Sequence, residues 1–355
     1  MSPAPLNSEL PHMRIAQVAP LHESVPPKCY GGTERVVSYL TEELVRQDHD
    51  VTLFASGDSK TAARLVPGCS RSLRMNEESV NHLASHLLLL EEVYQRAGEF
   101  DVIHFHVGYF HYPISRRQSK PHVTTLHGRL DLPELPPLYR EFDDIPIVSI
   151  SDSQRASLNE ANWQATIPHG LPTDLYTFHP EAGDYFAFLG RISPEKRVDR
   201  AIEIATEVDV PLRIAAKVDP ADQEYYENEI EPLLDSPLVD FVGEITEEEK
   251  DDFLGNARAL LFPIDWPEPF GLVMIEALAC GTPVIAYRHG SVPEVLEDER
   301  TGFLVDNCKE AVWAARQISK IDRHACRAYF EKNYAVSRMA NGYLNVYERL
   351  LNKSH

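Results

Sequence analysis

The chain has 355 residues, and its 34 Lys and Arg against 55 Asp and Glu give a formal net charge of −21. Hydrophobic residues make up 43% and charged residues 25%, a globular composition that excludes a disordered or collagen-like chain and, at this length, predicts about two domains. The acidity argues against a nucleic-acid partner, which requires a basic surface, and no apolar run approaches the roughly 18 residues of a transmembrane helix.

At the N-terminus, residues 1–12 lack the apolar segment that secretory signals contain, so we expect a flexible leader there. The five cysteines are widely spaced and form no C-x-x-C pair: Cys29, Cys69, Cys280, Cys308 and Cys326. This spacing disfavours a disulfide framework and a structural zinc site, and it favours a reducing, cytoplasmic location.

In the first half of the chain, apolar strand-like runs alternate with segments whose apolar residues recur at helical spacing. The expected strands are residues 14–19, 51–55, 102–106, 122–126 and 147–150. The expected helices are residues 33–46 and 81–96.

The second half repeats this alternation. Its expected strands are residues 185–189, 212–216, 238–242, 259–263 and 284–287, and its expected helices are residues 194–207, 221–234, 247–256 and 270–279. Many of the strands are almost continuously apolar, which is typical of parallel sheets covered by helices on both faces. The predicted fold class is therefore α/β, with two doubly wound, Rossmann-like domains that face a central cleft.

The domain boundary is predicted in residues 169–180, which are rich in Gly, Pro and turn-forming residues. This places an N-terminal domain at residues 13–172 and a C-terminal domain at residues 173–332. The tail, residues 333–355, contains an amphipathic helix that we expect to cross back to the N-terminal domain. The charge run EEEKDD, residues 247–252, is expected to be a solvent-exposed helix face.

Ligands of parallel sheets bind beyond the carboxyl ends of the strands, so the residues that follow strands are the first candidates for a site. Gly31 and Gly32 lie between the first expected strand and the first expected helix. Paired glycines let backbone N–H groups approach an anion, and the helix N-terminus adds positive potential. An ordinary turn is the alternative. The segment matches neither the G-x-G-x-x-G fingerprint of nicotinamide dinucleotide enzymes nor the P-loop.

Arg191 and Lys196 follow the strand expected at residues 185–189. With Ser193 as the helix cap and Pro194 as the first helical residue, Arg191 should precede a helix and Lys196 should lie in its second turn. Two cations and a helix dipole would form a clamp for a diphosphate. The alternative is that both cations pair with surface carboxylates.

Two carboxylates follow the strand expected at residues 259–263. Glu268 precedes the next expected helix and Glu276 lies inside it, so six helical residues, or about 9 Å, separate Phe270 from Glu276. This separation suits hydrogen bonds to hydroxyls at the two ends of an extended ligand. The alternative for Glu276 is a solvent-facing position.

Taken together, these segments resemble the retaining glycosyltransferases of the GT-B fold, glycosyltransferase family 4. The motifs that carry the resemblance are Gly31-Gly32, GRISPEK (residues 190–196), EPFGLVMIE (268–276) and ACGTPVIA (279–286). The resemblance implies a nucleoside-diphosphate-sugar donor bound mainly by the C-terminal domain. It also implies an acceptor bound mainly by the N-terminal domain.

The resemblance further implies roles for individual residues, with diphosphate, ribose and sugar each contacted by different groups. The residues it assigns to the reaction centre are His127 beside the donor sugar, Arg191 and Lys196 on the diphosphate, and Glu268 on the transferred sugar. The donor-binding residues are Gly31 and Gly32 facing the diphosphate, the backbone of Phe270, Gly271 and Leu272, and Glu276 on the ribose hydroxyls.

One segment departs from the family pattern. Many relatives carry a Gly-Asp-Gly-like turn after the second strand of the donor domain, whereas this chain reads Ala-Ala-Lys-Val-Asp-Pro at residues 215–220. Lys217 is therefore expected to point toward the cleft and to add a third cation to the diphosphate site.

No metal or other cofactor is expected. The D-x-D string at residues 48–50 lies between a helix and a strand, at the wrong end of the sheet for a ligand site. His104, His106 and His111 lack a carboxylate partner at a spacing that would favour a metal.

The resulting hypothesis is a retaining hexosyltransferase that forms an α-glycosidic bond without a metal. Its donor would be of the UDP-glucose or GDP-mannose type, and its acceptor a sugar, a small metabolite or a lipid. One alternative is a GT-B-fold sugar-nucleotide epimerase, which needs no acceptor. Another is a non-catalytic nucleotide-sugar-binding protein, and a nicotinamide oxidoreductase is disfavoured by the missing glycine fingerprint.

Overall fold

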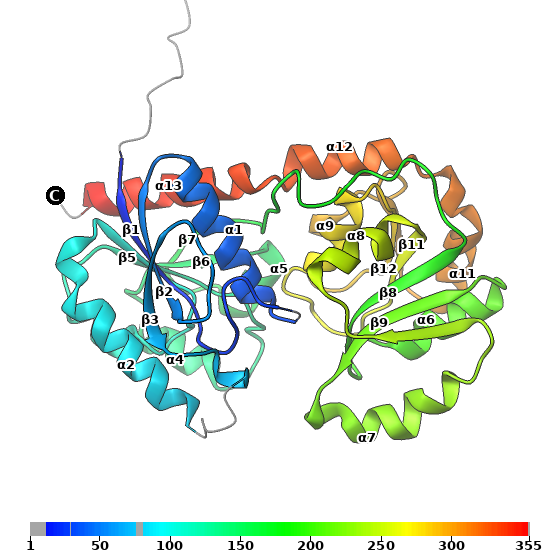
Figure 1. Ribbon diagram of the computed structural model, residues 1–355, viewed down its shortest axis with the longest axis horizontal. Coiled ribbons are helices and arrows are strands. Elements are labelled where there is room, and N and C mark those ends of the chain that lie inside the picture. The colour runs from blue at the N-terminus through cyan, green and yellow to red at the C-terminus, as the bar shows by residue number, and fades with distance from the viewer. Residues whose placement is uncertain (1–11, 29, 76–80, 354–355) are drawn as a thin grey trace, which may run out of the picture.

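The computed structural model describes residues 12–28, 30–75 and 81–353. These residues form two α/β lobes that lie side by side, and helices near the C-terminus run along both of them (Figure 1). Residues 1–11, which make up nearly all of the expected leader, and Cys29 lie outside the described residues. Within the described segments, no helix is both long enough and apolar enough to cross a lipid bilayer.

The N-terminal lobe contains a parallel seven-stranded sheet with the order β3-β2-β1-β4-β5-β6-β7. Its strands are β1 (Arg14–Val18), β2 (Asp50–Ser56), β3 (Arg64–Cys69), β4 (Val102–Phe105), β5 (His122–Thr125), β6 (Ile147–Ser149) and β7 (Trp163–Thr166). Its helices are α1 (Gly32–Arg46), α2 (His82–Gln95), α3 (Tyr112–Ser115), α4 (Leu135–Glu141) and α5 (Asp152–Arg155).

The C-terminal lobe contains a parallel six-stranded sheet with the order β10-β9-β8-β11-β12-β13. Its strands are β8 (Tyr185–Ile192), β9 (Leu212–Val218), β10 (Val239–Gly243), β11 (Ala257–Phe262), β12 (Val284–Tyr287) and β13 (Gly302–Val305). Its helices are α6 (Val198–Glu207), α7 (Gln223–Tyr225), α8 (Glu247–Gly255), α9 (Leu272–Ala279), α10 (Val292–Val295), α11 (Cys308–Gln317) and α12 (Arg323–Asn333).

Every strand expected from the sequence is present, with ends that differ by at most a few residues, and the two parallel α/β sheets confirm the predicted fold class. Three strands were missed: β3, β7 and β13. All three lie at sheet edges. The short strand β13 begins at a glycine and is mostly buried, whereas β3 and β7 are only partly buried, which weakens their apolar signal. In β3, Pro67 and Gly68 further weaken that signal.

The helix expected at residues 194–207 begins later than predicted, because the preceding strand is longer. The ladder between β8 and β9 continues to the pair Ile192–Val218, and Arg197 takes a left-handed conformation with φ 53° before α6 starts at Val198. Ser193 is therefore not a helix cap and Pro194 is not a helical residue. Arg191 lies in the strand itself, and Lys196 lies in the turn that follows it.

Two other expected helices also differ. Residues 221–234 form a succession of short turns, including a π-type turn at Tyr226–Ile230, and Pro232 interrupts the hydrogen-bond pattern of a continuous helix. The helix expected from residue 270 starts at Leu272. Gly271 precedes it with φ 80°, a left-handed conformation that glycine adopts without a steric penalty.

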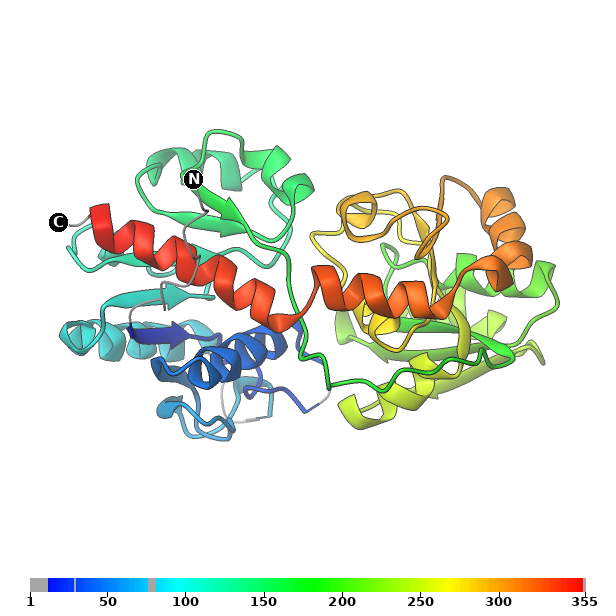
Figure 2. The ribbon, with the colours of Figure 1, turned by 90° about the horizontal axis from the view of Figure 1, so that it is seen from above.

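The final helix, α13 (Val336–Lys353), packs on the N-terminal lobe, as Figure 2 shows. The chain crosses between the lobes twice at one place, where Leu171 pairs with Ala335 and its N–H donates to the carbonyl of Tyr334 at 2.8 Å. Farther along α13, Tyr347 is hydrogen-bonded to Gln17 at 3.1 Å and to His104 at 2.7 Å. The helix therefore ties the end of the chain to the N-terminal sheet. The residue limits of the domains stay a prediction.

Candidate functional site

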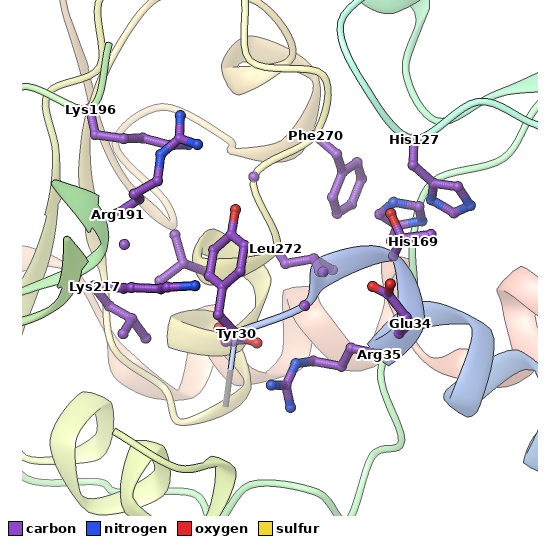
Figure 3. A pocket seen from close by; sticks show the side chains of 18 of the residues that line it. Tyr30, Glu34, Arg35, His127, His169, Arg191, Lys196, Lys217, Phe270 and Leu272 are labelled. Atoms are coloured by element: carbon purple, nitrogen blue, oxygen red, sulfur yellow. The ribbon is translucent and has the colours of Figure 1, made fainter. Parts of the chain in front are cut away.

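A cleft of about 490 Å³ opens between the lobes, beside the carboxyl ends of the central strands of both sheets. Every residue predicted for the site lines it: Gly31, Gly32, His127, Arg191, Lys196, Lys217, Glu268, Phe270, Gly271, Leu272 and Glu276. Figure 3 shows the cations on one wall and His127 on the opposite wall. The fold thus brings together residues that are widely separated in the sequence, while their roles remain predictions.

Two of the cations come from neighbouring strands. Arg191 and Lys217 are paired in register between β8 and β9, so their side chains leave the sheet on the same side. Lys217 lies 3.1 Å from Asp219 and 5.3 Å from the centre of the Tyr30 ring. Arg191 meets carboxylates at the longer distances of 3.4 Å (Asp222) and 3.5 Å (Asp219). These loose contacts leave the guanidinium able to turn toward a stronger anion.

Lys196 and Glu268, both of which line the cleft, form an ion pair within the C-terminal lobe. The indole N–H of Trp266 also donates to the Glu268 carboxylate at 3.2 Å, and the ammonium of Lys196 lies 5.2 Å from the same indole ring. Glu268 is only 8% exposed, so these two donors offset the cost of burying its carboxylate. Two residues that the resemblance placed at the reaction centre are therefore directly coupled to each other.

The second carboxylate, Glu276, is buried and pairs with Lys250 of α8 at 2.9 Å. Lys250 belongs to the charge run at residues 247–252, and the expectation that this run is solvent-exposed is wrong for Lys250. Lys250 shares one face of α8 with Phe253 and Leu254, three and four residues later, and that face packs inward. This spacing was the signal in the sequence that could have identified Lys250.

The opposite wall carries a network of neutral histidines. His106 Nε2 lies 2.8 Å from the amide oxygen of Gln17, which can only accept, so His106 donates from Nε2 and accepts at Nδ1. His127 Nε2 lies 2.8 Å from that Nδ1 and must therefore donate to it. This leaves His127 Nδ1 as an acceptor, and within the described part of the chain it has no hydrogen-bond partner. The atom is suited to accept a hydrogen bond from a sugar hydroxyl.

Two further residues on this wall were missed from the sequence. His169 is buried, stacks on His127 at 5.3 Å and meets the edge of Phe270 at 4.8 Å. Glu34, in the first turn of α1, is buried beside them (Figure 3), and desolvation raises the pKa of its carboxyl group. His169 falls in the segment predicted as the domain boundary, and Glu34 lies two residues after Gly32 with no motif of its own. Their position in the cleft depends on the fold.

The burial of these histidines predicts how the stability of the folded protein changes with pH. Burial lowers the pKa of His127 to about 3 and holds the pKa of His104, His106 and His169 well below the ordinary value. In the unfolded chain each titrates near 6.5, so below that pH the unfolded state binds more protons and stability falls. At pH 5.5 each deeply buried histidine should lower the free energy of unfolding by about 1.4 kcal/mol. We expect Tm to drop on the order of 10 °C between pH 7.5 and 5.5.

A control separates this effect from the net charge. The sequence pI is about 5.1, so acidification toward pH 5.5 reduces self-repulsion, which by itself would raise Tm. His169→Gln should flatten the pH dependence, whereas the same change at the exposed His324 should not. A Tm that stays constant from pH 7.5 to 5.5 would contradict the assignment of neutral, buried histidines.

Comparison with known protein families identifies the family to which this chain belongs. The family model described as "Glycosyltransferase Family 4" matches residues 30–174, and the model described as "Glycosyl transferases group 1" matches residues 177–334. The first covers the lobe with the histidine wall, and the second covers the lobe with the cations. The chain belongs to glycosyltransferase family 4. It is a GT-B glycosyltransferase, as the sequence resemblance implied.

Curated relatives of this glycosyltransferase are distant. A D-inositol 3-phosphate glycosyltransferase of Salinispora arenicola is 25% identical over 93% of this chain and 89% of its own length. A probable sucrose-phosphate synthase of Thermosipho melanesiensis is 28% identical, but the match covers 52% of this chain and 47% of that protein. A phosphatidyl-myo-inositol mannosyltransferase of Mycobacterium leprae is 24% identical over 95% of this chain and 96% of its own length.

Solved structures share the GT-B fold. The sucrose-phosphate synthase of Thermosynechococcus elongatus aligns with a TM-score of 0.79 at 18% identity and covers 96% of this chain and 100% of that one. HepE of Anabaena, solved in complex with UDP and glucose, aligns with a TM-score of 0.75 at 17% identity and covers 95% of this chain and 100% of that one. At these identities the likeness shows the fold alone.

In this glycosyltransferase, Gly290 holds the loop that carries Glu268. Gly290 has φ 58°, and a Cβ atom added there would lie 2.3 Å from the backbone N and 2.4 Å from the backbone O of Glu268. Backbone atoms cannot yield, so Gly290→Ala should displace Glu268, lower stability by about 2 kcal/mol and lower activity on the order of 100-fold.

The measurements are Tm and the rate of sugar transfer. Gly98→Ala is the matched control, because nothing lies within 4 Å of a Cβ at that position. Activity of Gly290→Ala equal to that of Gly98→Ala would show that this contact does not place Glu268.

Proposed function

We propose that this glycosyltransferase moves a hexose from a nucleoside-diphosphate sugar, of the UDP-glucose or GDP-mannose type, to an acceptor hydroxyl. In this proposal the reaction retains the anomeric configuration, forms an α-glycosidic bond and needs no metal. The observation that carries it is the cation wall: Arg191, Lys196 and Lys217 line one side of the interdomain cleft next to Glu268 and Glu276. The printed names of relatives, which include inositol 3-phosphate glycosyltransferases and a protein solved with UDP and glucose, support a donor of this class.

The donor is proposed to lie along the C-terminal lobe. The diphosphate takes the place between the three cations and the N–H groups of Gly31 and Gly32, where the positive end of α1 adds to the attraction. Glu276 accepts hydrogen bonds from the ribose hydroxyls, and Glu268 accepts them from the transferred sugar. The backbone of residues 270–272, just before and at the start of α9, contacts the sugar and phosphate.

Charge stabilisation is the main chemical contribution expected of the protein. As the bond between the sugar C1 and the bridging phosphate oxygen breaks, negative charge grows on the diphosphate, and fixed cations aimed at that charge lower the barrier. The acceptor oxygen forms the new bond to C1 on the same face, and its proton passes to a phosphate oxygen of the donor. His127, neutral and with Nδ1 as an acceptor, orients a hydroxyl beside this centre.

The acceptor is proposed to bind on the histidine wall of the N-terminal lobe, and its class stays open among a sugar, a small metabolite and a lipid. The acidic chain argues against a nucleic acid. A cytoplasmic location is part of the proposal, since Cys69, Cys280, Cys308 and Cys326 are free thiols.

The experiment is a thermal-shift screen followed by a transfer assay. UDP, GDP, ADP and their glucose and mannose derivatives are tested first, because a ligand at 100 times its Kd stabilises the folded state by about 2.7 kcal/mol. We expect the UDP or the GDP series to raise Tm. Release of the nucleotide from the donor found in this way should then depend on an added acceptor.

Each alternative has its own signature in these assays. Interconversion of sugar nucleotides without an acceptor would replace the proposal with an epimerase. Binding without any release, across a panel of sugars, phosphorylated polyols and lipids, would replace it with a nucleotide-sugar-binding protein. No stabilisation by any of the nucleotides would overturn the donor site.

A further inference from the structure

Lys250 is the buried partner of Glu276. Its ammonium lies 2.9 Å from Glu276 Oε1, and the Glu276 side chain is only 3% exposed. A buried carboxylate without a counter-charge is strongly destabilising, so Glu276 depends on this lysine. Burial lowers the pKa of Lys250, and the adjacent carboxylate opposes that shift. Both residues line the cleft, so the pair belongs to its wall.

The pair continues into a chain of charges that reaches the other lobe. Lys250 lies 3.5 Å from Glu247, one turn earlier in α8, and Glu247 forms an ion pair with Arg35 of α1. The hydroxyl of Tyr176 also donates to Glu247. Arg35 lies in the first turn of α1, the helix that follows Gly31. The helix that carries the glycine pair is thus joined by charges to the carboxylate on the opposite lobe.

We propose that Lys250 is a positioning residue for the donor ribose, which fixes Glu276 by one carboxylate oxygen so that the other accepts a hydrogen bond from a ribose hydroxyl. This inference rests on the proposed function, in which Glu276 binds the ribose. Among the described residues, no hydrogen bond engages Oε2 of Glu276, whereas Oε1 is held by Lys250. The contact from Glu247 to Arg35 makes the position of Lys250 depend on the N-terminal lobe.

The test compares nucleotides that differ by one hydroxyl. Isothermal titration calorimetry on the full chain measures the Kd of UDP and 2′-deoxy-UDP, and of GDP and 2′-deoxy-GDP. Wild type should bind one ribonucleotide about tenfold or more tightly than its deoxy form. Lys250→Met should raise the Kd of that ribonucleotide about 10- to 100-fold, the range expected for the loss of a hydrogen bond to a charged group. It should also abolish the preference for the ribonucleotide over its deoxy form.

Three further variants complete the design. Lys250→Arg keeps the charge and should restore part of the preference. Lys309→Met, at an exposed position of α11, is the matched control and should bind like wild type. Arg35→Gln leaves Lys250 in place and should reduce the preference several-fold. If circular dichroism shows that Lys250→Met does not fold, Arg35→Gln carries the test, and a preference equal to that of wild type then overturns the inference.

The outcomes separate the two proposals. If no nucleoside diphosphate binds wild type, the proposed function itself fails. If wild type prefers the ribonucleotide and Lys250→Met keeps that preference, only the role of Lys250 fails. The same holds if Lys250→Met weakens the binding of the ribo and deoxy forms by the same factor. Equal binding of the ribo and deoxy forms by wild type would remove Glu276 from the ribose site and the inference with it.

Discussion

Replacing Lys196 with methionine is expected to lower kcat/KM for sugar transfer about 10³-fold while the fold survives. Removing one group that stabilises charge in a transition state typically costs about 10²- to 10³-fold. Here the loss should lie at the upper end, because the substitution also leaves the buried Glu268 without the ammonium that it contacts. Glu268→Gln should cause a loss of similar size, and alanine at either position should abolish turnover.

The measurement is acceptor-dependent release of nucleotide by each variant, with Tm as the test of folding. Lys309→Met removes a lysine outside the cleft and should retain full activity. Because Lys196 and Glu268 touch, their losses should not multiply, and the double variant should be little slower than either single one. Activity near that of wild type in both single variants would show that the reaction centre lies elsewhere.

The central strands could be predicted because their own residues form continuous apolar runs, which indicate burial. In β8, the first four positions, Tyr185 to Phe188, are all buried and apolar, so the run is visible without knowledge of its neighbours. In β7, every residue from Trp163 to Thr166 is only partly buried. That strand is defined by its pairing with β6. Because the two segments are separated in the chain, the local sequence does not indicate this pairing.

The same reason explains which parts of the site could be predicted. Arg191 and Glu268 follow apolar strands and belong to recognisable motifs, so their meeting in one cleft could be expected. The geometry of Arg191 could not, because the length of β8 depends on its ladder with β9. The place of His169 in the site depends on His127, which is distant in the sequence. For Lys250 the local spacing indicates burial, but its pairing with Glu276 depends on the fold.

Arg323 is the clearest example of a structural residue whose role depends on contacts with distant parts of the sequence. It is the first residue of α12 and is only 7% exposed. Its guanidinium donates to the carbonyls of His179, Gly255 and Ala257 at 2.6, 2.6 and 2.9 Å, and to the Thr282 hydroxyl at 2.7 Å. One side chain thus joins the linker, the end of α8, the start of β11 and the loop after α9. Burial lowers its pKa, and these acceptors are what offset the cost of burying the charge.

Arg323→Met is expected to lower the stability of the C-terminal lobe by about 3–5 kcal/mol, because three carbonyls that accept from the guanidinium would lose their donors inside the protein. This corresponds to a Tm lower by about 6–12 °C or more, measured by thermal unfolding. Arg323→Lys keeps a charge but lacks the planar fork that reaches several acceptors, so it should fall between wild type and Arg323→Met. Arg316→Met, at an exposed position of α11, should change stability by less than about 0.5 kcal/mol. If Arg323→Met and Arg316→Met unfold at the same temperature, the four hydrogen bonds of Arg323 contribute nothing measurable, and the lobe is held together by its apolar core alone.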